Sequence, residues 1–381
     1  MTEKLYDIDS YIKEFDANVI SCCEDGGKFK VVLDKTAFFP EEGGQDSDRG
    51  VMGDAALLDV QETQGEIYHF TDKALEIGST VKCVIDWERR FDYMQQHTGE
   101  HMVSGVAHRL FGCENVGFHL SEDIVTVDFD KMLTREQILE IEKEANKAVF
   151  ENQKVKAFFP DSEALKTLEY RSKKEIDGQI RIVEIENTDM CACCAPHVKE
   201  TGQVGLIKLL DSEKLRGGIR IEMKCGGRAL RDYNDKYDNV RKISAALAVK
   251  QTETADGVER LLKNLGEMKF KITNLKRQSI DGKISAFNPE RNITAVFEED
   301  FEIKELQSYS DGLCKTYGGI RGVFSAVDGG FAFAICGENN ELDKFFAEFK
   351  TAFTVRGGGR NGMVQGTVLA KREEIDEFFH E

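Results

Sequence analysis

His97-Thr98-Gly99-Glu100-His101 is the stretch that decides the fold, because it lies where the sequence changes from the period of a strand to that of a helix. From Glu88 onward, apolar residues and the two histidines recur at three- and four-residue steps, as they do on one face of a helix. Gly112 suits the end of this helix, because glycine readily adopts the left-handed conformation of a C-cap. The stretch therefore predicts a helix from about residue 88 to 112 that presents both imidazoles on one face.

Residues 1–87, before this helix, alternate in the manner of β-strands. Lys28–Leu33 and Val81–Ile85 alternate polar and apolar side chains, with glycine-rich breaks between such segments. The segment Phe38–Gln45 has the composition of a turn, because its paired glycines permit positive φ. Several short strands at this spacing predict a small N-terminal β-barrel.

Residues 88–235 combine the helix with further strands and a second helix. Ile124–Phe129 has strand character, and Thr134 is a suitable N-cap for an amphipathic helix that follows it. This mixture predicts an α+β domain that contains the two histidines.

Residues 236–285 are basic and helical, with 11 Lys and Arg against 6 Asp and Glu. Their apolar residues form a heptad seam, namely Val258, Leu261, Leu265, Met268, Ile272 and Leu275. About two and a half heptads are present, which fits a packed helix or a helical hairpin as well as a coiled coil. We therefore predict a helical linker or hairpin that can also dimerise two copies.

Residues 286–381 alternate strand and helix patterns and contain the glycine-rich run Gly357–Gly366. They predict a small α/β domain. The fold class is thus α+β in four parts: an N-terminal barrel (1–87), a metal-binding domain (88–235), a helical linker (236–285) and a glycine-rich α/β domain (286–381).

Composition limits the functional classes. The chain has 381 residues, enough for two or three domains, and a net charge of −18. It shows no signal peptide and no apolar run of membrane-spanning length, so we expect a cytoplasmic protein without a membrane partner. In a reducing compartment its 10 Cys are expected as ligands or buried thiols rather than disulfides.

Two short motifs together predict a metal site. His97 and His101 are four residues apart on one helical face, and Cys193 and His197 are four apart further along the chain. Imidazoles with a thiolate make a tetrahedral N/S set, which favours Zn2+. Cys191 and Cys194 are competing ligands from the same segment, and two ordinary surface histidines are the alternative for the first motif.

These stretches, with the Gly-Gly-Gln of Phe38–Gly50 and the segments Thr201–Gly205 and Arg216–Glu222, resemble the long form of the AlaX family. AlaX proteins are free-standing relatives of the alanyl-tRNA synthetase editing domain. The glycine-rich run is similar to the end of the synthetase's C-terminal domain, so the resemblance spans nearly the whole chain.

The resemblance implies that the four residues His97, His101, Cys193 and His197 bind zinc. It implies hydrolysis, in trans, of the ester that joins serine, and possibly glycine in addition, to alanine tRNA, tRNA(Ala). Glu100 stands where the synthetase usually has threonine, and it is a candidate general base. His119 is a candidate polar contact in the catalytic site.

Four residues are candidates for substrate binding, namely Gly43, Gly44, Gln45 and Arg220. The glycines could bring backbone amides to the 3′-terminal adenosine, although a simple turn explains them equally well. The basic helical linker and the pair Arg356 and Arg360 are the expected tRNA-facing surfaces, because phosphate contacts need only local positive charge.

Two other functions fit the same motifs. His97–His101 matches H-x-x-E-H, the helical signature of a class of metallopeptidases in which Glu100 would be the base. A non-catalytic tRNA-binding module with structural zinc is the other alternative, because four protein ligands usually mark a structural site. A homodimer through the linker or the C-terminal domain is compatible with each of them.

Overall fold

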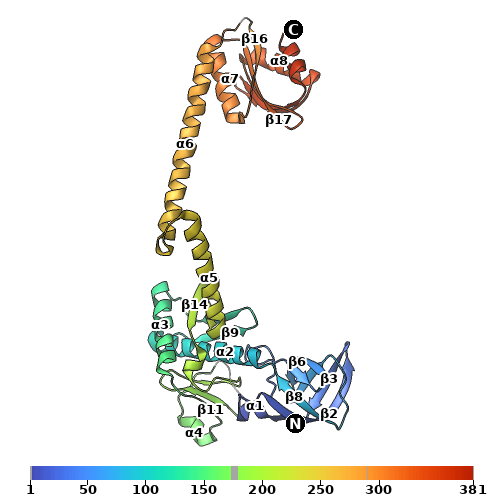
Figure 1. The fold of residues 1–381 in the computed structure, drawn as a ribbon, viewed down its shortest axis with the longest axis vertical. Coiled ribbons are helices and arrows are strands. Elements are labelled where there is room, and N and C mark those ends of the chain that lie inside the picture. The colour runs from blue at the N-terminus through green and yellow to red at the C-terminus, as the bar shows by residue number, and fades with distance from the viewer. Residues whose placement is uncertain (1, 173–178, 290, 381) are drawn as a thin grey trace. The chain divides into compact units, whose positions relative to one another are not determined.

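The computed structural model describes residues 2–172, 179–289 and 291–380. The chain forms two compact units, residues 1–241 and 242–381 (Figure 1). Both helices and strands contribute to each unit, which confirms the mixed α+β class. Within the part of the chain that is described, no helix combines the length and apolarity that a membrane crossing requires.

Six strands near the N-terminus form a closed barrel in the order β2-β3-β7-β6-β5-β8. Their bounds are β2 Glu14–Asp25, β3 Lys28–Leu33, β5 Gly50–Met52, β6 Ala55–Thr63, β7 Glu66–Thr71 and β8 Thr80–Ile85. A short parallel pair, β1 (Glu3–Lys4) with β4 (Lys35–Thr36), and the helical turn α1 (Leu5–Ile8) accompany the barrel. Phe38 and Phe39, from the segment after β4, fill the barrel's apolar core.

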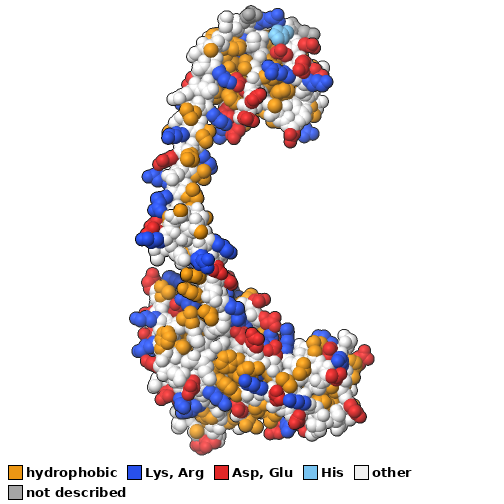
Figure 2. Space-filling view, viewed as in Figure 1, with side chains coloured by type: hydrophobic (Ala, Val, Ile, Leu, Met, Phe, Trp, Pro, Cys, Tyr) orange, Lys and Arg blue, Asp and Glu red, His pale blue; other side chains and the backbone are white. Residues whose placement is uncertain are grey.

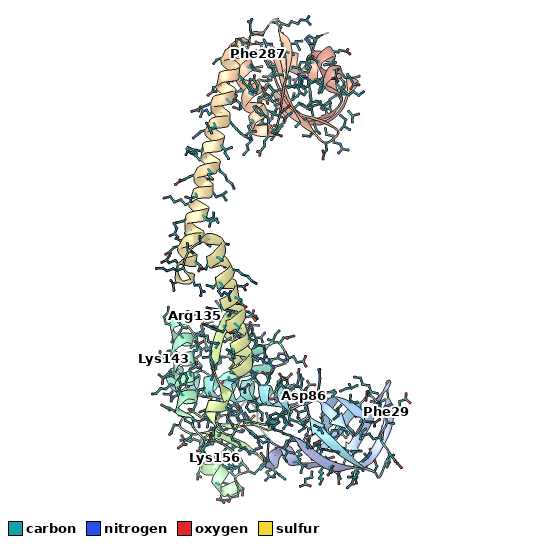
Figure 3. All side chains as sticks on the ribbon, in the orientation of Figure 1. Phe29, Asp86, Arg135, Lys143, Lys156 and Phe287 are labelled. Atoms are coloured by element: carbon teal, nitrogen blue, oxygen red, sulfur yellow. The ribbon has the colours of Figure 1, made fainter. Side chains whose placement is uncertain are left out.

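The predicted helix is confirmed as α2 (Trp87–Phe111). Asp86, labelled in Figure 3, directly follows the last barrel strand, and its side chain accepts a hydrogen bond from the Arg89 N–H as the N-cap. Gly112 ends the helix in the left-handed conformation, at φ 61°. From Gln96 to Ala107 every residue of α2 is buried, so this helix runs through the core of the first unit.

Two sheets and a second helix surround α2. The sheet β14-β15-β10-β9 and the sheet β11-β12-β13 are antiparallel throughout. The strands are β9 Asn115–Leu120, β10 Val125–Phe129, β11 Val155–Phe158, β12 Ile182–Ile185, β13 Asp189–Ala192, β14 Ile207–Leu215 and β15 Gly218–Cys225. As predicted, Thr134 caps α3 (Arg135–Glu151), through a capping box with Gln137. The short helices are α4 (Ser162–Thr167) and η1 (Thr201–Val204).

Three helical segments carry the chain from one unit into the other. They are α5 (Gly226–Leu247), the turn η2 (Gln251–Glu253) and α6 (Thr254–Ala286). The buried residues of α6 are Gly257 and Ile280, whereas the predicted heptad seam is exposed along its length. Apolar side chains and Lys and Arg both appear along the surface of α6 (Figure 2).

The second unit is built on a five-stranded sheet in the order β16-β17-β18-β20-β19. The strands are β16 Ile293–Glu298, β17 Ile320–Val327, β18 Gly330–Cys336, β19 Thr354–Arg360 and β20 Met363–Leu369. Its helices are α7 (Ile303–Tyr317), α8 (Asn339–Ala352) and α9 (Arg372–His380). The glycine-rich run forms the antiparallel pair of β19 with β20.

Candidate metal centre

Four side chains from two distant segments converge inside the first unit. His97 and His101 come from α2, and Cys193 and His197 come from the segment that follows β13. One donor atom from each lies within 4.8 Å of all the others. The Cys193 sulfur lies 3.6 Å from Nε2 of His97 and 3.4 Å from Nε2 of His197. The structure therefore brings together all four residues of the predicted ligand set.

The local folds of both segments explain this convergence. The helical repeat stacks His97 over His101, with ring centroids 5.4 Å apart. Cys193 is held through its backbone, because its N–H donates to Arg181 O at 3.0 Å. The Arg181 guanidinium in turn donates to Cys193 O and Ala195 O at 3.0 and 2.9 Å. A rigid helix thus faces a loop that a buried arginine fixes.

The Nδ1 atom of each imidazole also makes a hydrogen bond with a side chain outside the four-residue cluster. The contacts are His97 to Gln45 Oε1 at 2.8 Å, His101 to Asp189 Oδ2 at 3.0 Å and His197 to Thr98 Oγ1 at 3.0 Å. Amide and carboxylate oxygens only accept hydrogen bonds, so Nδ1 of His97 and of His101 carries the proton. Nε2 is therefore the atom through which each of these two rings can bind a metal ion within the cluster.

The electrostatics of the cluster favour a thiolate at Cys193. Burial opposes ionisation, but the imidazoles of His97, His197 and His101 outweigh it and hold the pKa of Cys193 well below its usual range. Burial lowers the pKa of His197 to about 3, which keeps that ring neutral. At His101 the Cys193 charge and the Asp189 hydrogen bond outweigh burial and raise the pKa well above its usual value, so binding of a metal ion there would displace a proton from the ring.

The other two cysteines of the segment have different surroundings. Burial raises the pKa of the Cys191 thiol to about 11, and burial together with the Cys193 charge raises the pKa of Cys194 further. Cys191 lies near His101 and Asp189, outside the four-residue cluster. Of the three candidates that the sequence left open, the structure places Cys193 among the three imidazoles.

Asp189 and Arg171 support the cluster and were not found from the sequence. Arg171 forms a bidentate pair with Asp189, with Nε and Nη2 at 2.8 and 2.9 Å from the two carboxylate oxygens. Those two hydrogen bonds and the one from His101 outweigh burial, so the pKa of Asp189 is lowered. Gly105 of α2 allows the chain to approach closely at Thr188, just before β13, because a Cβ on Gly105 would lie 2.4 Å from Thr188 O. The sequence signal for Asp189 was only its position beside the cysteine cluster.

The Gly-Gly-Gln turn lies against the strand β9 beside the cluster. Gly43 and Gly44 have φ of 64° and 84°, and a Cβ on Gly44 would lie 2.4 Å from Phe118 O. Backbone hydrogen bonds from Leu120 N–H to Gly44 O and from Asp46 N–H to Leu120 O fix the turn on β9. This close approach places the side-chain oxygen of Gln45 within hydrogen-bond distance of Nδ1 of His97.

The three other predicted site residues, Glu100, His119 and Arg220, are not among the four clustered donors. Glu100 is buried and accepts hydrogen bonds from Ser104 and from Asn115 on β9. Phe118 packs on His97, with ring centroids 4.7 Å apart, whereas its neighbour His119 is exposed and alternates to the other face of β9.

Arg220 on β15 forms a bidentate ion pair with Asp128, at 2.7 and 2.8 Å. Its guanidinium also lies 3.6 Å from Glu213. The structure therefore places Arg220 in a paired setting on the sheet.

Two family models match the chain. The model described as tRNA synthetases class II (A) matches residues 7–89, and the model described as threonyl and alanyl tRNA synthetase second additional domain matches residues 180–222. The first match covers all six barrel strands, and the second begins just before the cysteine-bearing segment.

The chain is similar to both editing proteins and ligases. It is 30% identical to the alanyl-tRNA editing protein AlaX-L of Pyrococcus horikoshii, over 98% of this chain and 96% of that protein. It is 32% identical to the alanyl-tRNA editing protein Aarsd1 of Rattus norvegicus, over 66% of each. It is 34% identical to the alanine–tRNA ligase of Ignicoccus hospitalis, over 75% of this chain but 33% of the ligase, so it spans about a third of that enzyme. The chain therefore belongs to the AlaX family of alanyl-tRNA editing proteins, in its long form.

Proposed function

We propose that the protein is a trans-editing hydrolase that removes chiefly serine, with glycine as a secondary substrate, from mischarged tRNA(Ala) at a zinc site. The observation that carries this proposal is the convergence of three buried imidazoles and one partly buried thiol from two distant segments. The similarity to AlaX-L along almost all of both chains supports the substrate class.

The donor set fits zinc. Three nitrogens and one sulfur suit this borderline-soft ion better than they suit magnesium or calcium, which prefer oxygen ligands. His97, His101, Cys193 and His197 would hold it. When bound, zinc supplies a Lewis acid that can polarise an ester carbonyl or acidify a water molecule.

The chain's own groups would bind and orient the aminoacyl end. Among the described residues, the side-chain NH2 of Gln45 is buried without a hydrogen-bond partner, although its carbonyl oxygen is occupied by His97. This free donor would satisfy an oxygen of the substrate. The turn of Gly43 and Gly44 presents backbone beside it, and the Phe118 ring shields His97 from water.

Selectivity for serine over alanine would arise from polar groups of the site that lack a hydrogen-bond partner when alanine is bound. A site that hydrogen-bonds the serine hydroxyl leaves its own groups unpaired when alanine enters, which can discriminate by a factor on the order of 10⁴. An apolar cavity that merely accepts the smaller side chain would not protect correctly charged alanyl-tRNA.

The catalytic roles of Glu100 and His119, and the substrate contact of Arg220, stay predictions. Glu100→Gln keeps the shape of the side chain and removes its charge. It should lower the deacylation rate if Glu100 acts as a base, and it should change mainly stability if its bonds to Ser104 and Asn115 are its whole function.

A deacylation assay tests the proposal directly. Native protein should release serine and glycine from tRNA(Ala) while alanyl-tRNA(Ala) persists, and His101→Ala should lose both the activity and the bound zinc. His108→Ala is the matched control, because His108 lies on the same helix but pairs at the surface with Glu114. Equal hydrolysis of seryl and alanyl esters would contradict the selectivity.

A second candidate is a tRNA-binding module in which zinc is structural. The presence of four protein donors favours it, because structural zinc sites are usually closed in this way. This candidate predicts that tRNA binds without turnover. Cleavage of peptides in place of esters would instead point to a metallopeptidase.

We also propose that α6 dimerises two copies and contributes to tRNA binding. Its seam residues Leu261, Leu265 and Met268 are between 47% and 63% exposed and follow a heptad spacing. Lys263, Lys269 and Lys271 are exposed on the same helix, and Arg356 and Arg360 are exposed on β19. Sedimentation should report a dimer, and a monomer at all concentrations would contradict the dimer. Charge reversal of these lysines should weaken tRNA binding most at low salt.

A further inference from the structure

A cavity of about 590 Å³ opens in the first unit, beside the start of α2. Its wall is formed by the first turns of α2 and of α5, the residue before β5 and the connection between β9 and β10. Asp86, which Figure 3 labels, is one of its lining residues. None of the four clustered metal donors lines it, so the cavity is separate from the candidate metal centre.

Four arginines line this cavity, and they differ in how their charge is balanced. They are Arg49, Arg89, Arg228 and Arg231. Arg228 is 5% exposed and donates from Nε and Nη2 to Asp92, at 2.8 and 2.6 Å, so it is paired inside the fold. Arg231 is exposed and, within the part of the chain that the structure describes, has no ion-pair partner. Its guanidinium is therefore open to an anionic ligand.

Arg49 and Arg89 share one surface carboxylate, that of Glu122. Nη1 of each arginine contacts Oε1 of Glu122, and Nη2 of Arg89 also lies 3.8 Å from Asp46. The Glu122 side chain is 56% exposed, and ion pairs as exposed as this one are weak. A phosphate group offers guanidinium groups the same paired oxygens as a carboxylate does. A phosphate can therefore take the place of Glu122 at these two arginines.

The wall also contains carboxylates and aromatic rings, so the cavity is not simply a basic patch. Asp86 caps α2 by accepting from the Arg89 N–H, and Glu88 is exposed on the same turn. The ligand must therefore offer more than negative charge.

Aromatic rings and a guanidinium plane supply stacking surfaces in this wall. The Arg89 guanidinium lies over the buried Tyr93 ring, 4.4 Å from its centroid. The half-buried rings of Trp87 and Phe91 line the same cavity, with centroids 5.8 Å apart. Proteins recognise single-stranded nucleotides by stacking bases on aromatic rings and arginine planes and by placing phosphates on cationic groups. The lining of the cavity thus favours a nucleotide over a simple anion.

The position of the cavity relates it to the metal centre. Arg89, Tyr93 and His97 follow one another at four-residue steps on α2, which is about 6 Å per step along the helix axis. The Tyr93 hydroxyl donates to Asp46 Oδ2 at 3.4 Å, and the preceding residue, Gln45, contacts Nδ1 of His97. A nucleic-acid strand whose terminal ester lies at the metal donors would place the preceding nucleotides at this cavity.

We propose that the cavity binds the single-stranded 3′ end of tRNA, with Arg49, Arg89 and Arg231 holding backbone phosphate in place of the Glu122 carboxylate. The inference rests on the proposed function, because it takes tRNA as the substrate. It adds a contact within the first unit to those proposed for α6 and β19.

Binding of uncharged tRNA(Ala), measured by fluorescence anisotropy with intact tRNA and with tRNA trimmed of its single-stranded 3′ end, tests the proposal. Arg231→Gln and Arg49→Gln should each weaken binding of intact tRNA about three- to tenfold and lower the slope of log affinity against log salt by about 0.7. Neither variant should alter binding of trimmed tRNA. Both side chains are exposed, so these variants should fold. Arg135→Gln is the matched control, because Arg135 is exposed at the start of α3 and donates to Leu210 O outside the cavity.

Glu122→Gln gives a change of the opposite sign. It removes the carboxylate that competes with phosphate for Arg49 and Arg89, so it should tighten binding of intact tRNA about threefold. A loss of affinity would mean that Glu122 holds the arginines for binding instead of competing with phosphate, and it would overturn the exchange that we propose. Unchanged affinity for intact tRNA in the Arg231, Arg49 and Glu122 variants would overturn the site itself, as would equal losses with intact and trimmed tRNA.

The binding assay separates this inference from the proposed hydrolysis, because the tRNA carries no ester. Hydrolysis of seryl-tRNA(Ala) by native protein, together with unchanged binding in the arginine variants, would overturn the cavity assignment alone. Weakened binding in those variants without any hydrolysis by native protein would support the cavity and overturn the editing activity. Absence of tRNA binding by native protein would overturn both.

Discussion

The helices α2 and α6 have the same apolar step of three and four residues, but their surroundings are opposite. Every α2 residue from Gln96 to Ala107 is buried, including charged and imidazole side chains. The buried residues of α6 are Gly257 and Ile280, and its apolar seam is open along most of the helix. Periodicity therefore identifies a helix and its apolar face, but it does not say whether that face is covered within the chain.

The comparison also explains where the chemistry lies. The buried helix carries polar groups whose partners are all supplied by the fold, such as His101 with Asp189 and Arg90 with Asp48. Such groups are costly to leave unpaired, so substitutions on α2 should have large effects. Substitutions on the exposed seam of α6 should act mainly through a second chain.

The largest expected effect is at the buried ion pair that ties α2 to the barrel. Arg90 and Asp48 are at most 1% exposed, and the same guanidinium also donates to Ser10 O and Ala37 O. Asp48→Asn leaves a buried positive charge unpaired and should lower the free energy of unfolding by about 3–5 kcal/mol. Denaturant unfolding measures this loss. The exposed pair of Glu14 with Lys82 is the control, since Glu14→Gln should cost less than about 1 kcal/mol.

Next in size is a pH effect from the barrel core. His69 is buried and neutral, with Nδ1 donating to Val31 O, and burial lowers its pKa to about 4. Between pH 6.5 and 4 the unfolded histidine binds a proton that the folded one does not. Stability is thus full above pH 6.5 and falls by on the order of 3 kcal/mol as the pH approaches 4. Acid titration of the unfolding free energy should show this slope, and an equal slope in His69→Gln would refute the assignment.

A smaller effect is expected for substitution of Asp189, whose carboxylate accepts a hydrogen bond from Nδ1 of His101. Asp189→Asn weakens the acceptor that fixes the imidazole and should reduce zinc affinity about 10- to 100-fold, as measured by competition with a chelator. Glu114→Gln is a matched control, because Glu114 makes the same kind of contact with His108, at 2.8 Å on the surface of α2. Equal zinc affinity in both variants would show that Asp189 does not act on the metal site.

The smallest effect on the folded monomer is expected on α6. Leu265 is 47% exposed, so Leu265→Lys should change the unfolding free energy of the monomer by no more than about 0.5 kcal/mol. The same change places a charge in the heptad seam and should shift the sedimentation of the proposed dimer to that of a monomer. Lys269→Ala, on the same helix, should leave sedimentation unchanged. A large loss of monomer stability would mean that the seam is covered within the chain.

Much of the candidate site could be predicted, because its four donors lie in two short motifs. The spacing of His97 with His101 follows from the helical repeat, and Cys193 with His197 offers complementary donors. Gln45 was predicted as a substrate contact, and its position behind His97 depends on a turn that packs on β9. Asp189, Arg171 and Thr98 could not be assigned roles, because single polar residues far apart in sequence carry no spacing that links them.

The sequence by itself determined the helices, the strand-rich start and the two pairs of candidate metal donors, because these depend on periodicity and on short-range spacing. Tertiary structure alone decided which cysteine joins the imidazoles and which face of β9 meets His97. Those outcomes depend on long-range packing. A shift of one residue along a strand exchanges the side chains on its buried face for those on its exposed face.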